Sequence, residues 1–324
     1  MKNKLLYKLR SGKNPKFIYY SVNALRLVIP KGIFRLRLQG KLSSLSRRKD
    51  KDYIERRVDY YNKLSGTVQL PSSAPHLSEH KMSKQKVYFF DTYQYTRWFS
   101  DQFQWGFCPG DVTFVPDYPS IVKSRPLTDD HATSIVMKLD KVRHFIFVED
   151  KKAFTEKKNM VIFRGKVKGK PSRKLFMEMY FHHPMCDLGD VSKNTTDPAE
   201  WRTEKKTINE HLDYKFIMAL EGIDVASNLK WVMSSNSIAV MPRPTCETWF
   251  MEGTLIPNYH YIEIKPDFSD LEERLNYYIE HVDESLEIIR HAHEYVSQFK
   301  DKRRENLISL LVLDKYFKMT GQKS

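Results

Sequence analysis

Residues 161–173, VIFRGKVKGKPSR, contain in thirteen positions a strand, a turn and the start of a helix. Val161–Phe163 is a short apolar run of strand type, and it ends in a turn at Gly165. Pro171-Ser172 is a typical helix entry, and the apolar residues of 174–181 have helical spacing. The stretch therefore predicts a strand-to-helix junction, the kind of element from which nucleotide-binding α/β domains are built.

The glycines of this junction exclude two large enzyme classes. Residues 165–170, GKVKGK, resemble half of a phosphate-binding P-loop, but their spacing is wrong. The chain also lacks the GxGxxG pattern of dinucleotide-binding enzymes. P-loop NTPases and dinucleotide-dependent enzymes are therefore poor candidates.

Downstream of the junction, strand and helix patterns continue to alternate. Strands are expected at Phe216–Leu220, Ser237–Met241 and Tyr259–Ile264, and helices at Ala226–Ser234 and from a capping box at residues 269–272 to about Phe317. Such alternation predicts an α/β sheet, whose ligands lie at the carboxyl ends of the strands and near helix N-termini. The turns at 163–165 and 222–228 are junctions of this sort.

The upstream half is expected to form a second domain. Further apolar runs of strand type occur after a linker rich in Ser and Pro at residues 65–79; these runs are Val87–Phe90, Val112–Val115 and Phe145–Val148. We expect a basic amphipathic leader at 1–60, an α/β domain at 61–150 and a nucleotide-binding Rossmann-like domain at 151–299. The C-terminal helix, 300–324, is expected to pack back on the domain at 61–150.

The positive charge of the chain is concentrated at its start. The net charge is +14, and residues 1–60 contain 17 Lys and Arg but only four acidic residues. Basic and apolar residues alternate in this leader, a pattern that suits an anionic membrane surface. A solvated basic helix and a nucleic-acid-binding segment are the two other interpretations. Because the remaining chain is nearly neutral, a nucleic-acid partner is not expected.

The three cysteines indicate a reducing compartment. Cys108, Cys186 and Cys246 are scattered and form neither a disulfide framework nor a CxxC zinc pair. The sequence shows no signal peptide, and Phe17–Ile29 is too short and too polar to span a bilayer. We expect a cytoplasmic protein bound peripherally to a membrane surface.

Four segments in order resemble glycosyltransferase family 90, which includes bacterial lipopolysaccharide-modifying and capsule-associated transferases and protein O-glucosyltransferases. They are VTFVPDYPSIVKSRP at 112–126, VIFRGKVKGKPSR at 161–173, residues 214–241 and residues 246–265. The resemblance implies a GT-B-like fold with two Rossmann-like domains facing a cleft, the acceptor-side domain at 61–150 and the nucleotide-sugar-binding domain at 151–299. Together with the basic leader, it implies peripheral binding to the inner face of the bacterial inner membrane. It also implies metal-independent transfer with inversion, from a UDP-sugar to a lipopolysaccharide-core or other cell-surface glycan, and no cofactor besides this donor.

The resemblance assigns the general base to Asp117, which lies before an aromatic residue and a proline. A carboxylate there would accept the proton of the acceptor hydroxyl as its oxygen attacks the anomeric carbon. The family usually has Arg before this acid, whereas this chain has Pro116. The alternative interpretation is a turn residue preceding Pro119. Asp111 is the second candidate for the base.

The donor site is expected to contain residues from three of the segments. A departing nucleotide diphosphate needs fixed positive charge and N–H donors, and an arginine provides both. Gly165 would allow the backbone to approach the phosphates closely. Lys230 and Trp249 have alternative interpretations, as an exposed helical lysine and as a core residue. The residues assigned to the donor are Arg164, Gly165, Arg173, Ser227, Asn228, Lys230, Glu247 and Trp249.

Two other classes of function are also compatible with the sequence. A basic, non-enzymatic protein that binds membranes or nucleic acid would use the leader alone. A glycoside hydrolase would need two facing carboxylates, which Asp117 and Glu247 could provide. A metal site is not expected, because His182-His183 and the cluster at 129–131 lack the spacing of metal ligands.

Overall fold

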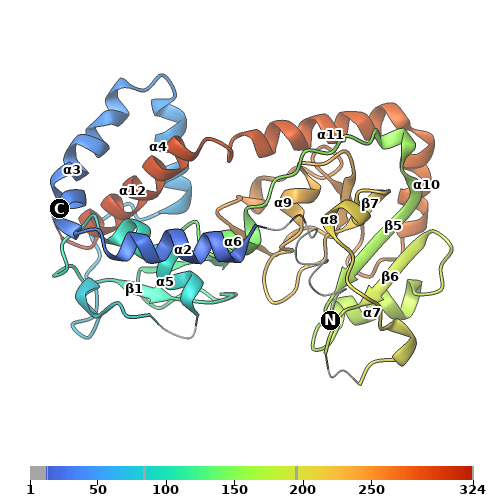
Figure 1. Ribbon diagram of the computed structural model, residues 1–324, viewed down its shortest axis with the longest axis horizontal. Helices are drawn as coiled ribbons and strands as arrows, with labels where there is room; N and C mark the ends of the chain where they lie inside the picture. The colour runs from blue at the N-terminus through green and yellow to red at the C-terminus, as the bar shows by residue number, and fades with distance from the viewer. Residues whose placement is uncertain (1–11, 13, 83–84, 194–195, 323–324) are drawn as a thin grey trace. The chain divides into compact units, whose positions relative to one another are not determined.

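A computed structural model describes residues 12, 14–82, 85–193 and 196–322 of the chain (Figure 1). These residues form two compact units. The five-stranded unit contains residues 143–244 and 254–298, together with the described residues before Pro15; the helical unit contains residues 15–142, 245–253 and the described part of 299–324. Each unit has a parallel sheet of its own, so the predicted mixed α/β class is confirmed.

The five-stranded unit is a wholly parallel sheet with helices between its strands. Its strands lie in the order β10-β8-β7-β5-β6. The elements in chain order are β5 (Lys158–Gly165), α7 (Pro171–Tyr180), β6 (Cys186–Asp190), α8 (Ile208–His211), β7 (Tyr214–Met218), α9 (Leu229–Val232), β8 (Ile238–Met241), β10 (Ile262–Glu263), α10 (Leu271–Glu280) and α11 (Val282–Ser297). The strand-to-helix junction expected at residues 161–173 is confirmed as β5 followed by α7.

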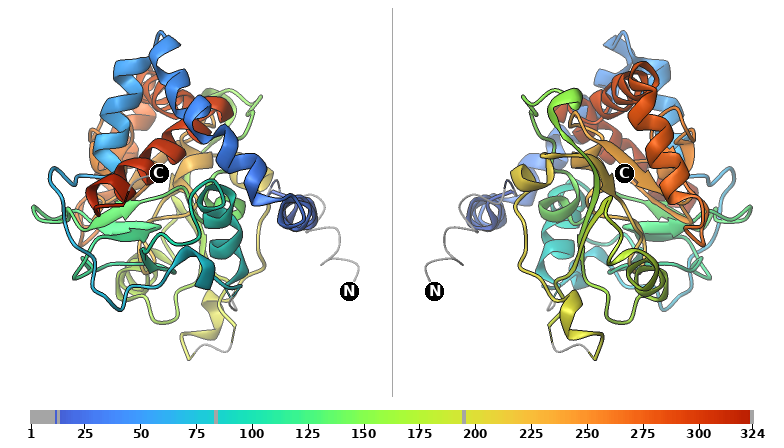
Figure 2. Two further views of the ribbon diagram at one scale, coloured as in Figure 1. Left: turned by 90° about the vertical axis from the view of Figure 1, so that its left-hand side faces the viewer. Right: turned by 90° about the vertical axis from the view of Figure 1, so that its right-hand side faces the viewer.

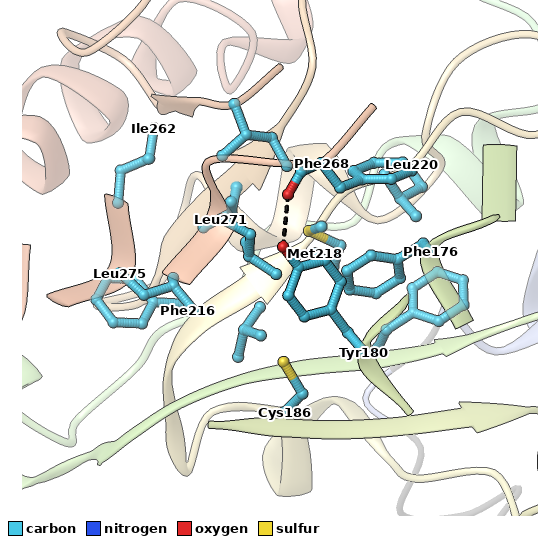
Figure 3. Packing of buried hydrophobic residues seen from close by; sticks show 14 of the residues in the cluster. Phe176, Tyr180, Cys186, Phe216, Met218, Leu220, Ile262, Phe268, Leu271 and Leu275 are labelled. Carbon is cyan, nitrogen blue, oxygen red and sulfur yellow. Dashed lines mark hydrogen bonds between the residues drawn. The ribbon is translucent and has the colours of Figure 1, made fainter. Parts of the chain in front are cut away.

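Strand register gathers the core of this unit on one face of the sheet. Val161 pairs with Phe216, which in turn pairs with Ile238, so every second residue of each strand points to the same side. Side chains of α7, α10 and α11 pack against this face (Figure 3). Within it, the Tyr180 hydroxyl donates a 2.7 Å hydrogen bond to the Phe268 carbonyl. Even-numbered residues of β5 therefore point to the opposite face.

The helical unit has a smaller sheet and most of the long helices. Its strands β1, β2 and β4 are parallel, and β3 pairs with β9 in an antiparallel ribbon. The elements are α2 (Lys16–Leu27), α3 (Lys31–Ser43), α4 (Lys51–Tyr61), α5 (Lys86–Thr96), β1 (Gly106–Cys108), β2 (Ser120–Val122), β3 (Ser124–Pro126), β4 (Ser134–Val136), β9 (Cys246–Thr248) and α12 (Lys302–Met319). The short helix α6 (Lys141–His144) lies where the chain passes between the units.

The last helix, α12, packs beside the first helices of the same unit. In Figures 1 and 2 it is the red helix next to the blue α3 and α4. Arg57 of α4 donates a 2.6 Å hydrogen bond to Glu305 of α12, and both side chains are buried. Val58 and Tyr61 are also buried. The end of the predicted leader, residues 51–60, is therefore part of a packed core and not a separate segment.

Three expected strands are wrong. Val87–Phe90 lies in helix α5, which is buried on several sides and so shows no amphipathic period. Val112 forms its backbone hydrogen bonds with the Ser124 hydroxyl instead of a neighbouring strand. Residues 145–148 are extended but outside any sheet, and the Val148 N–H donates to the Ser234 hydroxyl.

Several downstream elements are shorter than predicted. The expected helix at 226–234 is only α9, and the expected strand at 259–264 is only β10. Helix α10 begins where the capping box predicted, but its N-cap residue Asp270 makes no capping hydrogen bond. The Asp270 carboxylate instead accepts a 2.9 Å hydrogen bond from the Lys265 N–H. The start of the helix is therefore fixed by the preceding loop.

Within the described ranges, no helix combines the length and the apolar character needed to cross a bilayer.

Candidate functional site

The sheet of the five-stranded unit reverses its direction of winding between β5 and β7. Numbered in chain order within this sheet, its strands lie in the order 2-1-3-4-5, with β5 as the first strand and β7 as the third. In open parallel sheets of this order, ligands bind outside the carboxyl ends of the first and third strands, because their connections leave toward opposite faces. The loops after Gly165 and Met218 therefore form the candidate ligand-binding edge.

Arg173 joins the two loops at this edge. From α7, its Nη1 donates a 3.0 Å hydrogen bond to the carbonyl of Lys166, after β5. Its Nη2 and Nε donate bonds of 2.7 and 3.0 Å to the carbonyls of Leu220 and Glu221, after β7. Gly222 leaves room for this fork, since a Cβ there would lie 3.3 Å from Nη2.

The charge of Arg173 is not balanced by an acid. Its hydrogen-bond acceptors are backbone carbonyls, and among the described residues it forms no ion pair. Burial lowers the pKa of its guanidinium to about 10. Three of its five N–H groups are used by the carbonyls, so two remain for an anion. The edge thus presents a fixed cation that an incoming anion would stabilise.

The loop between β5 and α7 adds further positive charge. Lys166 and Lys168 are exposed on it, with Gly169 between them and the helix. The loop is held from β6: the Val167 N–H donates to the Asp190 carboxylate at 3.1 Å and to the Ser192 hydroxyl at 3.0 Å. Gly169 has a φ of +68°, a conformation that favours glycine. The backbone is therefore fixed while the lysines point to solvent.

Arg164 lies at the same strand end but is already paired. Its Nη1 donates to the carbonyl of Asp187 at 2.7 Å, and its Nη2 donates to the Asp187 carboxylate, which also accepts from the Tyr214 hydroxyl. Burial raises the pKa of Asp187, but the hydrogen bonds from Tyr214 and Arg164 outweigh it and hold that pKa below its ordinary value. The charge of Arg164 is thus neutralised within the protein.

The glycine after Arg164 is required by packing. A Cβ on Gly165 would lie 2.4 Å from the ring of Phe163. The expected role of Gly165, close backbone approach to a phosphate, stays a prediction.

The three candidates near α9 differ in exposure. Ser227 is exposed, whereas Asn228 is half-buried and donates a 2.9 Å hydrogen bond to the Met218 carbonyl, which ties the loop to the end of β7. Lys230 is fully buried. The alternative interpretation of Lys230 as an exposed helical lysine is therefore wrong.

The two candidate bases lie in the helical unit. Asp117 is exposed in the loop before β2, and its carboxylate makes no hydrogen bond or ion pair with the described part of the chain. Asp111 is half-buried and pairs with Lys123, whose side chain is buried. Of the two carboxylates, Asp117 is the one open to an incoming hydroxyl.

Glu247 is part of a closed charge network in the helical unit. It lies on β9 opposite Arg125 of β3, and the Arg125 Nε donates to it at 2.7 Å. The Tyr60 hydroxyl donates to its other oxygen, while Arg125 also donates to the Tyr60 carbonyl at 2.8 Å. Glu247 and Arg125 are both buried. A Cβ on Gly253 would lie 2.9 Å from the carboxylate, so the backbone closes the remaining side.

Trp249 is a core residue, which was the alternative to a donor-site residue in the interpretation of the sequence. It is fully buried and stacks on Tyr61, with 3.9 Å between ring centroids. Its Nε1 donates a 2.6 Å hydrogen bond to Glu305, which also accepts from Arg57. The assignment of Trp249 to the donor site is corrected, because its ring has no free surface for a ligand.

Comparison with known proteins identifies the chain. Residues 132–321, more than half of it, match the sequence profile of glycosyl transferase family 90. The chain belongs to this family. It is 38% identical over 267 residues to the O-glucosyltransferase LpsA of Dichelobacter nodosus, a match that covers 82% of this chain and 83% of that protein. The predicted resemblance is confirmed, and the protein is a glycosyltransferase.

The family 90 profile covers the candidate donor residues but not the candidate base. The matched range contains Arg164, Arg173 and Glu247 and begins after Asp117. The role of Asp117 in this family 90 transferase therefore stays a prediction.

No pattern in the sequence points to the partners of these residues. Arg125 and Tyr60 meet Glu247 across 122 and 187 residues of chain, and Asp190 meets the lysine loop across 23. Arg125 does lie inside one of the family-like segments, but its pairing with β9 could not be read from that position.

Proposed function

We propose that this family 90 transferase moves a glucosyl or closely related residue from a UDP-sugar to a hydroxyl of a lipopolysaccharide core or another cell-surface glycan. The name of the Dichelobacter nodosus relative, an O-glucosyltransferase, supports both the sugar and the oxygen acceptor. The observation that carries the proposal is Arg173, a half-buried cation without an acidic partner among the described residues, at the switch point of a parallel sheet.

The donor diphosphate would bind at the edge formed by the loops after β5 and β7. A nucleotide diphosphate gains negative charge as the sugar leaves, so fixed donors stabilise the transition state more than the ground state. Arg173 offers its two remaining N–H groups, and Lys166 and Lys168 add charge that can adjust to the ligand. This arrangement would neutralise the leaving group without a metal ion.

Inversion would follow from a single displacement. Asp117 would accept the proton of the acceptor hydroxyl while that oxygen bonds to the anomeric carbon and the bond to UDP breaks. The open position of its carboxylate supports this role. The GT-B-like fold that the family resemblance implies stays part of this proposal.

The buried state of Glu247 counts against the glycoside hydrolase alternative. That mechanism would need Glu247 as a second carboxylate facing Asp117 across the sugar. Both oxygens of Glu247 are instead held by Arg125 and Tyr60 inside the helical unit.

Calorimetry with UDP tests the donor site. We expect Arg173→Gln to weaken UDP binding by about 1.5–3 kcal/mol, the usual contribution of hydrogen bonds to charged groups. Arg290→Gln is the matched control, since Arg290 is exposed on α11 and paired with Glu287 and Glu294. Unchanged UDP affinity in folded Arg173→Gln would remove Arg173 from the donor site.

Transfer from UDP-glucose, followed by mass spectrometry of the glycan, tests the reaction itself. Activity is expected to persist in EDTA. Transfer that stops in EDTA and returns with manganese would contradict the metal-independent mechanism.

A further inference from the structure

Helix α2 is packed with its polar side inward. The Tyr19 hydroxyl donates a 2.8 Å hydrogen bond to the buried Asp91 of α5. Asn23 is buried, and Arg26 donates to Gln94 of α5 at 3.0 Å. The side chains that fix this helix to the helical unit are therefore mostly hydrogen-bonding groups.

The opposite side of α2 is apolar and exposed. Phe17 is 82% exposed, Leu25 67% and Val28 77%. The exposed apolar side chains continue across the turn into α3, and we call the whole set the α2–α3 apolar surface: Phe17, Ile18, Val22, Leu25, Val28, Ile29, Ile33 and Leu36. A helix on a water-soluble surface normally has the reverse arrangement, with its apolar stripe toward the core. Exposed apolar side chains gathered on two consecutive helices are typical of a docking site.

The positive charge around this surface favours an anionic partner. Fourteen Lys and Arg precede the first acidic residue, Asp50. Lys16 and Arg37 are exposed on the two helices that bear the surface. In a symmetric dimer the same patch would face itself, which would bring two strongly positive segments together. An anionic lipid surface would neutralise them and also take up the apolar side chains.

We propose that the α2–α3 apolar surface inserts into the boundary between headgroups and acyl chains of an anionic bilayer, with α2 parallel to the membrane plane. Tyr19 and Arg26 keep the helix attached to the helical unit, so the folded protein and the inserted helix move together. This proposal does not depend on the donor site or on the reaction.

Vesicle flotation with the full chain tests the proposal. Wild-type protein is expected to float with phosphatidylcholine vesicles that contain about one third phosphatidylglycerol, and much less with phosphatidylcholine alone. The triple variant Phe17→Gln, Leu25→Gln and Val28→Gln keeps the charge and uses a good helix former. We expect its partition coefficient on the anionic vesicles to fall by at least about tenfold.

A matched variant controls for the loss of exposed apolar area in general. Leu175→Gln, Met179→Gln and Leu286→Gln removes three side chains that are 40–44% exposed in the other unit, and it should float like the wild type. The Phe17, Leu25 and Val28 variant should keep the wild-type melting temperature, because all three side chains are at least 67% exposed. The control variant should stay folded at the temperature of the flotation experiment.

Two results would overturn the proposal. Undiminished flotation of the Phe17, Leu25 and Val28 variant would place the membrane contact elsewhere. A wild-type dimer that becomes monomeric in this variant, with no vesicle binding by either, would show that a second copy covers the surface.

Discussion

The arginines of the two units differ in whether an acid balances their charge: Arg57 and Arg125 of the helical unit are buried with acidic partners, whereas the half-buried Arg173 of the five-stranded unit has none among the described residues. In the helical unit, Arg125 is enclosed by Glu247 and the Tyr60 carbonyl, and Arg57 is paired with Glu305. In the five-stranded unit, Arg173 is held by carbonyls alone, and its pKa is lowered by burial. A cation that has an acid inside the protein stabilises the fold, whereas one without an acid is suited to a ligand.

The largest expected effect concerns the open acid of the helical unit, Asp117. Asp117→Asn preserves shape but cannot accept a proton at neutral pH, so turnover should fall by about 10²–10⁴-fold. The UDP affinity and the melting temperature of this variant should equal those of the wild type. Asp117 is exposed, and asparagine is also common in turns. Initial rates and calorimetry would check both. Near-wild-type turnover would show that Asp117 is only a turn residue and would transfer the role to Asp111.

Breaking the buried network of Glu247, Arg125 and Tyr60 should lower the stability of the protein. Glu247→Ala leaves Arg125 buried without its acid, and we expect the free energy of unfolding to fall by about 3–5 kcal/mol. Glu263→Ala is the control: its partner Arg243 is largely exposed, so the loss should be below about 1 kcal/mol. Urea unfolding measures both. Equal losses of unfolding free energy in the two variants would show that the buried pair of Glu247 stabilises the fold no more than the exposed pair of Glu263.

A smaller effect on stability is expected at Asp187, whose carboxylate is bound by Arg164 and Tyr214 in the five-stranded unit. Because its folded-state pKa is depressed, its carboxylate stabilises the fold above the ordinary pKa, and this contribution is lost as pH falls through the folded-state value. Asp187→Asn should therefore cost about 1–2 kcal/mol at pH 7. The difference from wild type should shrink below about pH 4.

Urea unfolding over a pH series measures this difference. Asp213→Asn, at an exposed pair with Lys152, is the control and should have little effect at any pH. A loss at Asp187 that stays constant down to the lowest pH would show that the carboxylate charge is not its cause.

Much of the five-stranded unit could be predicted from the sequence. Strands of a parallel sheet are buried on both faces, so β5, β7 and β8 each contain a continuous apolar run of at least three residues. Pro171 marks the start of α7. Helix α5 was missed because Tyr88, Phe89 and Phe90 are all buried, and a helix buried on several sides resembles a strand over a few residues.

The candidate site was predicted less well, because burial and distant partners decide it. Arg164 and Arg173 have similar positions in the sequence, yet only the structure shows that Asp187 neutralises the first. Trp249 follows a motif that suggests a ligand contact, but Tyr61 and Glu305 enclose it from 188 and 56 residues away.

The connectivity of the helical unit has a consequence for synthesis on the ribosome. This unit draws on three separate stretches of chain, and Glu305 lies in the last of them. Arg57 and Trp249 are therefore translated well before the carboxylate that binds them. The last segment of the five-stranded unit ends at Gln298, so it is translated before α12. Since units fold as their segments become available, the helical unit, most of which is translated first, is expected to complete its folding last.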